Sequence, residues 1–206
     1  MAESKVSISN QALTKCGAST ITSFTDGSHE ANVCSVMYDN VANGLMYYTF
    51  WNFAITKAAL SLLTETPLDK SYTKVHSLPG DTIRIKGVFD NQGYYTTDYS
   101  VEGAKIYSNT NPLNIEYVQE TTEENFPGFF LEALIAKLAQ EINEAITGVG
   151  TLSDRLLQDF NIKLQAARIA DGQEEPPRNI MPVGRLVEAH YGSNGVIVDR
   201  YRHPTS

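Results

Sequence analysis

The residues that could carry out acid–base, metal or nucleophilic chemistry are few and scattered in this chain. It has four histidines, His29, His76, His190 and His203. No two of them have the spacing of metal ligands, and the sequence contains no P-loop, G-x-G-x-x-G, H-E-x-x-H or G-x-S-x-G motif. Surface or turn positions account for these histidines better than ligand roles do. We therefore expect no metal site, no cofactor and no catalytic residue, and we predict that the protein is not an enzyme.

Two other patterns favour a structural interpretation. Glu123 and Glu124 are neighbouring acids, but they come just before a predicted helix, where negative charge favours the helix dipole. Cys16 and Cys34 lack the close spacing of a metal or redox motif, and each lies in an apolar helical pattern. We interpret both cysteines as reduced packing residues.

An aromatic run in the first third of the chain has the composition of a platform on which nucleic-acid bases stack. It comprises Tyr47, Tyr48, Phe50, Trp51 and Phe53. However, no Lys or Arg lies between Lys15 and Lys57 to hold the phosphates of a nucleic acid. The run therefore indicates core or subunit packing, with Trp51 and Phe53 as structural anchors.

The composition points to an ordinary folded protein with an acidic surface. Hydrophobic residues make up 42% of the chain and charged residues 19%, and the formal net charge is −8. Nucleic-acid binding through phosphates needs a basic stripe, which this balance does not supply. No apolar run approaches the roughly 18 residues of a membrane span, and the first residues carry no apolar signal region. We expect synthesis in the cytosol and no contact with a membrane.

Helical periodicity dominates both ends of the sequence. A short helix over residues 4–16 would end at Gly17, and Ser28 is a predicted N-cap for a long helix over residues 29–48. Residues 57–63 have helical composition until Pro67. After Pro127, apolar positions spaced by three and four residues continue to about Ala170, with a break at residues 148–150. They predict an antiparallel helical hairpin.

A different period appears between residues 78 and 118, where apolar residues alternate. Candidate strands cover residues 82–85, 99–101, 105–107 and 113–118. We therefore predict a mainly α fold, an antiparallel helical bundle over residues 1–172 with a small β-rich insertion at about 78–118. Residues 173–206 form an extended C-terminal tail in this prediction.

Particular residues, in order along the chain, resemble those of the podovirus tail tubular protein A family, the head-to-tail adaptors of tailed bacteriophages. The resemblance begins at residues 7–13 and continues through Trp51-Asn52-Phe53-Ala54 and Leu78-Pro79-Gly80-Asp81. Later blocks are residues 99–106, 112–117 and 129–136. The series covers residues 7 to about 170, and its order is more telling than any one block.

The resemblance implies a structural virion protein with no catalytic residues. Its subunits would form a homo-oligomeric ring of twelve, located in the neck and tail of the virion. The implied partners are the portal protein, the tail nozzle (tubular protein B) and tail fibres. DNA would pass through the lumen during ejection without specific binding, and an acidic wall suits that passage because it offers phosphates no grip.

The tail supplies candidate residues for docking on the portal. They are Arg178, Ile180, Arg185, Val196, Ile197, Val198, Arg200 and Arg202. Arginines can meet an acidic partner surface, and the apolar run can pair with an exposed sheet edge. A solvated tail is the alternative for this segment.

Two other functions stay open at this point. A head-completion or stopper protein of a phage neck would share the helical bundle without needing to form a ring by itself. A hydrolase with a scattered active site is the alternative from another class. The gene's position beside a portal gene, or a mass measurement that shows a ring, would separate them.

Overall fold

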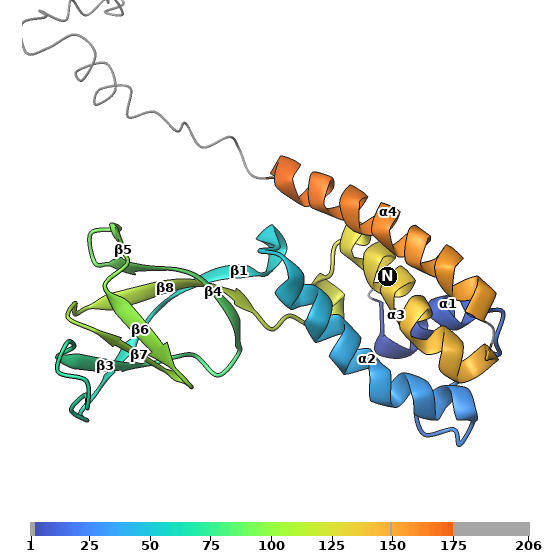
Figure 1. Ribbon diagram of the computed structural model, residues 1–206, viewed down its shortest axis with the longest axis horizontal. Coiled ribbons are helices and arrows are strands. Elements are labelled where there is room, and N and C mark those ends of the chain that lie inside the picture. The colour runs from blue at the N-terminus through green and yellow to red at the C-terminus, as the bar shows by residue number, and fades with distance from the viewer. Residues whose placement is uncertain (1–2, 149, 175–206) are drawn as a thin grey trace, which may run out of the picture. The chain divides into compact units, whose positions relative to one another are not determined.

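The computed structural model describes residues 3–148 and 150–174 of the chain. Its helices come in two pairs, one before the strands and one after them (Figure 1). The first pair is α1 (Lys5–Cys16) and α2 (His29–Tyr48), and the second is α3 (Gly128–Thr147) and α4 (Gly150–Glu174). The 3-10 helices η1 (Asn52–Ala54) and η2 (Glu123–Asn125) flank the strands. None of the helices in these residues is long and apolar enough to cross a membrane.

Local signals account for the ends of the first two helices. The Ser4 side chain accepts a hydrogen bond from the Ser7 backbone N–H, and Gly17 ends α1 with a left-handed φ of 73°. At the start of α2 the Ser28 hydroxyl accepts a hydrogen bond of 3.1 Å from the Ala31 N–H. The helices predicted over residues 4–16 and 29–48, with both caps, are therefore confirmed.

The helix α3 is the centre of the helical core, because it packs against α1, α2 and α4. The side chains of Phe130, Leu134, Leu138 and Ile142 on α3 are completely buried. Each such side chain contributes about 1.5–3 kcal/mol when it leaves water. The helix α4 returns antiparallel to α3 (Figure 1), as the hairpin prediction required.

Eight strands lie between the helix pairs and form two four-stranded antiparallel sheets. The first sheet has the order β1 (Ile55–Ala59), β8 (Leu113–Gln119), β4 (Thr82–Asp90), β5 (Tyr95–Thr96). The second has the order β2 (Ser61–Leu63), β3 (Lys74–Ser77), β7 (Lys105–Ser108), β6 (Tyr99–Glu102).

The outer strands of the two sheets follow one another directly in the chain. Only Leu60 separates β1 from β2, and only two residues separate β5 from β6, so at both sides one run of chain passes from one sheet into the other. These two links join the eight strands into a circuit along the chain. A second core accompanies the circuit and contains Leu60, Val88, Ile106, Leu113, Ile115 and Tyr117.

The prediction of a mainly α bundle with a small β insertion was wrong. The strands extend over residues 55–119 in two full sheets, so the fold is a mixed α and β one. Residues 57–63, predicted as helical from their composition, lie in β1 and β2, where Lys57 pairs with Glu116 and Leu62 with His76. Helix propensity is worth only tenths of a kcal/mol per residue, and strand pairing with distant residues outweighs it here.

The end of the last helix also differs from the prediction. The helix α4 continues to Glu174, beyond the predicted end at about Ala170, so Asp171 and Gly172 are helical. The predicted tail beyond residue 174 lies outside the described residues.

Candidate functional site

An aromatic cluster stands where the helices meet the strands. Trp51 is completely buried, and its Nε1–H donates to the Leu45 carbonyl at 2.9 Å. Its ring lies edge-on to Phe130 with centroids 5.2 Å apart. Phe53 is half-buried and contacts both Phe126 and Phe130, with centroid distances of 6.1 and 5.0 Å. The two predicted anchor residues therefore pack between the end of α2 and the start of α3.

A hydrogen-bonded clamp fixes the same junction to α4. The Asn52 backbone N–H donates to Asp171 Oδ1 at 2.8 Å, and the Asn52 side-chain amide donates to the Asp171 carbonyl at 2.7 Å. Asp171 is nearly buried, with 6% of its surface exposed. The strands begin directly after this clamp, and Ile55 of β1 pairs with Val118 of β8, the strand by which the chain leaves. Entry to and exit from the strands are thus fixed at adjacent points.

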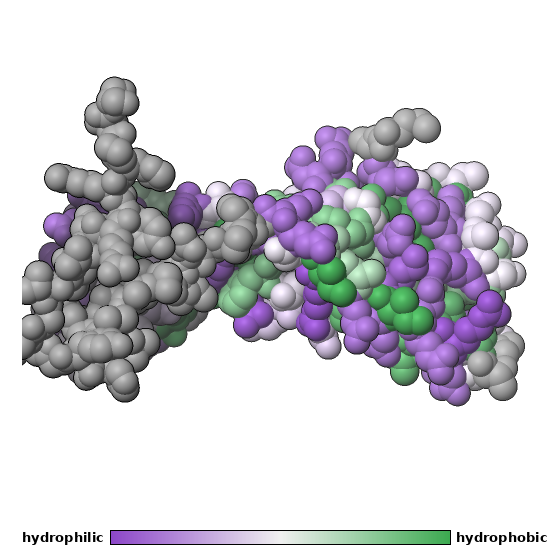
Figure 2. Space-filling model, turned by 90° about the horizontal axis from the view of Figure 1, so that it is seen from above, coloured by the Kyte–Doolittle hydropathy of each residue, from purple (hydrophilic) through white to green (hydrophobic). Residues whose placement is uncertain are grey.

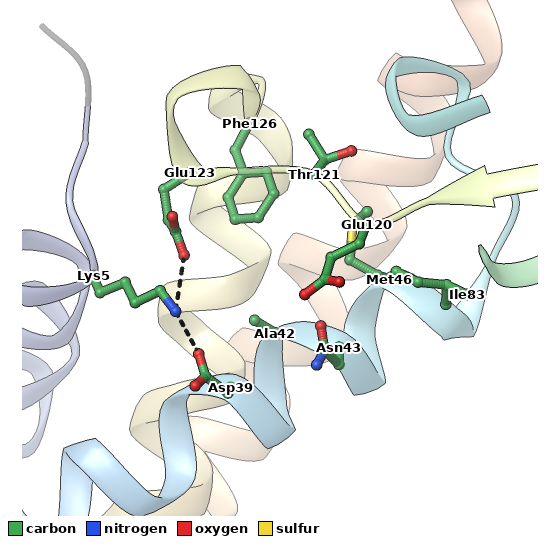
Figure 3. Close-up of a pocket in the computed structure, with 10 residues that line it drawn as sticks. All are labelled: Lys5, Asp39, Ala42, Asn43, Met46, Ile83, Glu120, Thr121, Glu123 and Phe126. Atoms are coloured by element: carbon green, nitrogen blue, oxygen red, sulfur yellow. Dashed lines mark hydrogen bonds and ion pairs between the residues drawn. The ribbon is translucent and has the colours of Figure 1, made fainter. Parts of the chain in front are cut away.

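A shallow acidic hollow of about 160 Å³ lies between α1, α2 and the segment that follows β8 (Figure 3). Lys5 Nζ lies 2.7 Å from Asp39 Oδ1 and 3.8 Å from Glu123 Oε1. The hydrogen bond to Asp39 is the main cause of a raised pKa for Lys5. The half-exposed pair contributes at most about 1 kcal/mol. We interpret the polar contacts around this hollow as structural, because they join α1 to α2 and to the segment after β8.

The histidines and cysteines within residues 3–148 and 150–174 have structural surroundings. No group of three or more His, Cys, Asp or Glu side chains in this part of the chain is placed to hold a metal ion. His29 is exposed, and its Nε2 atom lies 3.0 Å from the Ala145 carbonyl oxygen. Both cysteines are free and buried, and burial raises the pKa of the Cys16 thiol to about 11. These groups offer no evident catalytic arrangement.

The predicted surface or turn position is wrong for His76, which is completely buried on β3 and paired with Ile106 of β7. Neither ring nitrogen has a hydrogen-bond partner of good geometry. Burial lowers the pKa of His76 below the ordinary value of 6.5. The folded protein therefore keeps this imidazole neutral at pH values where the unfolded chain protonates it.

This difference predicts an acid-sensitive stability. Well above pH 6.5, neither the folded nor the unfolded chain carries an added proton on His76. As the pH falls below that value, the unfolded chain gains this proton first. The free energy of unfolding should then fall by up to about 1.4 kcal/mol per pH unit until the folded pKa is reached. Urea titrations between pH 7.5 and 5 measure it. His76→Leu should remove the slope and the exposed control His29→Asn should keep it; equal slopes in both variants would contradict the assignment.

A buried carboxylate lies in the strands, that of Glu116 on β8. Its side chain is 3% exposed, accepts a hydrogen bond from the Tyr95 hydroxyl and pairs with Lys86 Nζ at 3.2 Å. Burial acts to raise the pKa of Glu116, but the hydrogen bond from Tyr95 and the charge of Lys86 hold it below its ordinary value. A Cβ on Gly87 would lie 2.5 Å from the Tyr95 ring, so glycine in the middle of β4 is what lets that ring reach Glu116.

Unburied apolar side chains gather on two helices. On α4, Ile162 and Ile169 are 66% and 63% exposed. On α2, Tyr47 and Tyr48 are more than half exposed, and the Arg168 guanidinium of α4 lies 4.9 Å from the Tyr48 ring centre. Figure 2, a view from the α4 side, shows apolar patches interrupting a mostly hydrophilic surface. Single exposed apolar residues are normal on a protein surface, whereas a contiguous apolar patch is typical of a surface that another protein covers.

The structure brings together some predicted residues and adds others. Trp51 and Phe53 share one cluster, whereas the predicted docking residues from Arg178 to Arg202 lie outside the described part of the chain. Sequence reasoning missed Glu116 and Asp171. No sequence signal points to Glu116, because it takes a polar position in the alternating stretch Leu113-Asn114-Ile115-Glu116-Tyr117.

The comparisons with known proteins identify no relative, since the chain matches no protein-family model and no curated protein.

Proposed function

We propose that this chain is a structural virion protein, a head-to-tail adaptor subunit of a tailed bacteriophage. In this proposal, copies of the chain form a closed ring between the portal and the tail nozzle. The resemblance of residues 7 to about 170 to the tail tubular protein A family is one support. The observation that carries the proposal in the structure is the exposed apolar stripe on α4.

The two faces of α4 differ in burial. Leu156, Phe160 and Leu164 are at least 93% buried and belong to the core shared with α3. Ile162 and Ile169 are seven residues apart, so they lie on one face, roughly two helical turns from each other. A neighbouring subunit that packs on this face would bury both side chains.

A ring also fits the chemistry of the rest of the chain. A contact between two different surfaces of identical subunits repeats until it closes, and a fixed rotation per subunit requires a stiff subunit. The aromatic cluster and the Asn52–Asp171 clamp hold the segment that leads into β1 against α3 and α4. The net charge of −8 disfavours adhesion to DNA that passes through a lumen.

Mass photometry and negative-stain electron microscopy test the proposal, with the full chain alone and mixed with its portal protein. We expect closed rings for the wild type. The double variant Ile162→Asp/Ile169→Asp should remain monomeric at a concentration about tenfold above that at which the wild type forms rings. The reason is that burying two carboxylates in a contact is costly. The matched control Leu68→Asp, at a loop residue that is 97% exposed, should assemble normally. A wild-type chain that stays monomeric even with the portal protein would contradict the adaptor proposal.

A further inference from the structure

A second surface feature is a groove beside the end of α2. It is lined by the turn before β4, the first half of β4 and the β6–β7 turn, and the lining includes Tyr47, Leu78, Ile85, Val101 and Ala104. These side chains make its walls largely apolar. Val101 is 43% exposed and Tyr47 58% exposed, so the apolar surface is open to a partner.

One arginine stands among these apolar residues. The Arg84 guanidinium lies 4.1 Å from the Phe50 ring centre and 5.4 Å from that of Tyr47, and Arg84 Nη1 donates to the Tyr47 carbonyl at 3.3 Å. Stacking on two rings fixes the plane of the guanidinium and lowers the entropy that it loses on binding.

The charge of Arg84 has no carboxylate partner within the described residues. None of the salt bridges found there includes Arg84, and no described lining residue of the groove is acidic. Asp81 is next to the lining in sequence, but its carboxylate accepts hydrogen bonds from Tyr117 and Gln119. In a chain with a net charge of −8, a preoriented arginine without an acid beside it indicates an external anionic group.

We propose that this groove binds an extended segment of a partner protein in which branched apolar side chains precede a carboxylate. The apolar residues would cover Leu78, Ile85 and Val101, and the carboxylate would accept hydrogen bonds from guanidinium N–H groups that Arg84 does not use for the Tyr47 carbonyl. The overall negative charge and a single arginine argue against nucleic acid as the occupant.

This inference does not rest on the ring contact of α4, because a monomeric subunit would present the same groove. Fluorescence anisotropy with the full chain tests it. The first probe is a labelled eight-residue peptide, Gly-Ser-Val-Val-Val-Asp-Ser-Gly. The second is the same peptide with Asn in place of Asp. We expect saturable binding of the first peptide and about tenfold weaker binding of the second, since a charged hydrogen-bonded pair is lost.

Variants assign the binding to the groove. Arg84→Gln should weaken the aspartate peptide about tenfold and abolish the difference between the two peptides, as expected for a coupled pair. Arg84→Lys should restore only part of the affinity because it lacks the planar fork. Val101→Asp, at an exposed position, should abolish binding, whereas the control Leu68→Asp should not change it.

Three results would overturn the proposal. One is no saturable binding of the aspartate peptide up to about 1 mM. Another is unchanged affinity in both Arg84→Gln and Val101→Asp, with folding verified by circular dichroism. The third is tighter binding of a twelve-nucleotide oligothymidine than of the peptide at physiological salt, which would make the surface a nucleic-acid site.

Discussion

Replacing Trp51 with alanine should lower the free energy of unfolding by about 3–5 kcal/mol, the usual range for truncating a large aromatic in a core. The indole is completely buried and packs against Phe53, Phe129 and Phe130. Its loss would leave a cavity between the end of α2 and the start of α3. It would also leave the Leu45 carbonyl without its donor.

Urea denaturation followed by circular dichroism measures this effect at neutral pH. Tyr48→Ala is the matched control, because Tyr48 is an aromatic of the same run that is 57% exposed, and it should cost below about 1 kcal/mol. A loss below about 1 kcal/mol for Trp51→Ala would place the aromatic run at the surface and favour a stacking platform.

Removing the carboxylate of Glu116 should have an effect of similar size in the strands. Glu116→Ala leaves the amine of Lys86, only 23% exposed, without its ion pair, and it leaves the Tyr95 hydroxyl without the carboxylate that accepts its hydrogen bond. Breaking a buried pair on one side costs about 3–5 kcal/mol, and the partial exposure of Lys86 puts the expected loss at the lower end. Glu65→Ala breaks an exposed pair with Lys105 and should cost at most about 1 kcal/mol.

The pH dependence separates this role from simple packing. Because the folded pKa of Glu116 is below 4.5, its stabilising contribution is complete above that value and is lost as the pH falls through the folded pKa. Wild type should therefore lose more stability between pH 5 and 3 than Glu116→Ala does. The double variant Glu116→Leu/Lys86→Met should recover much of the loss at neutral pH, since an apolar pair of similar volume needs no charge compensation. If Glu116→Ala lowers the free energy of unfolding no more than Glu65→Ala does, the proposed stabilising role of the Glu116–Lys86 ion pair is contradicted.

Short-range features of the sequence determined the helical part of this protein. Ser4, Gly17 and Ser28 act on backbone groups within a few residues, and the apolar period that placed Leu134 and Leu138 in a core arises from the geometry of a single helix. Strand candidates at residues 82–85 and 113–118 also proved to lie in β4 and β8. Alternation is likewise a local signal.

Only the tertiary structure decided the rest, because the deciding contacts join residues far apart in the chain. Residues 57–63 have helical composition and became strands through pairing with β8 and β3. Asp171 lies just beyond the predicted end of the last helix and is the partner of Asn52. The burial of Glu116 depends on Tyr95 and on the space left by Gly87, and the exposure of Ile162 depends on which face of α4 meets α3. Pairing and burial depend on which distant segments meet, so no local pattern can specify them.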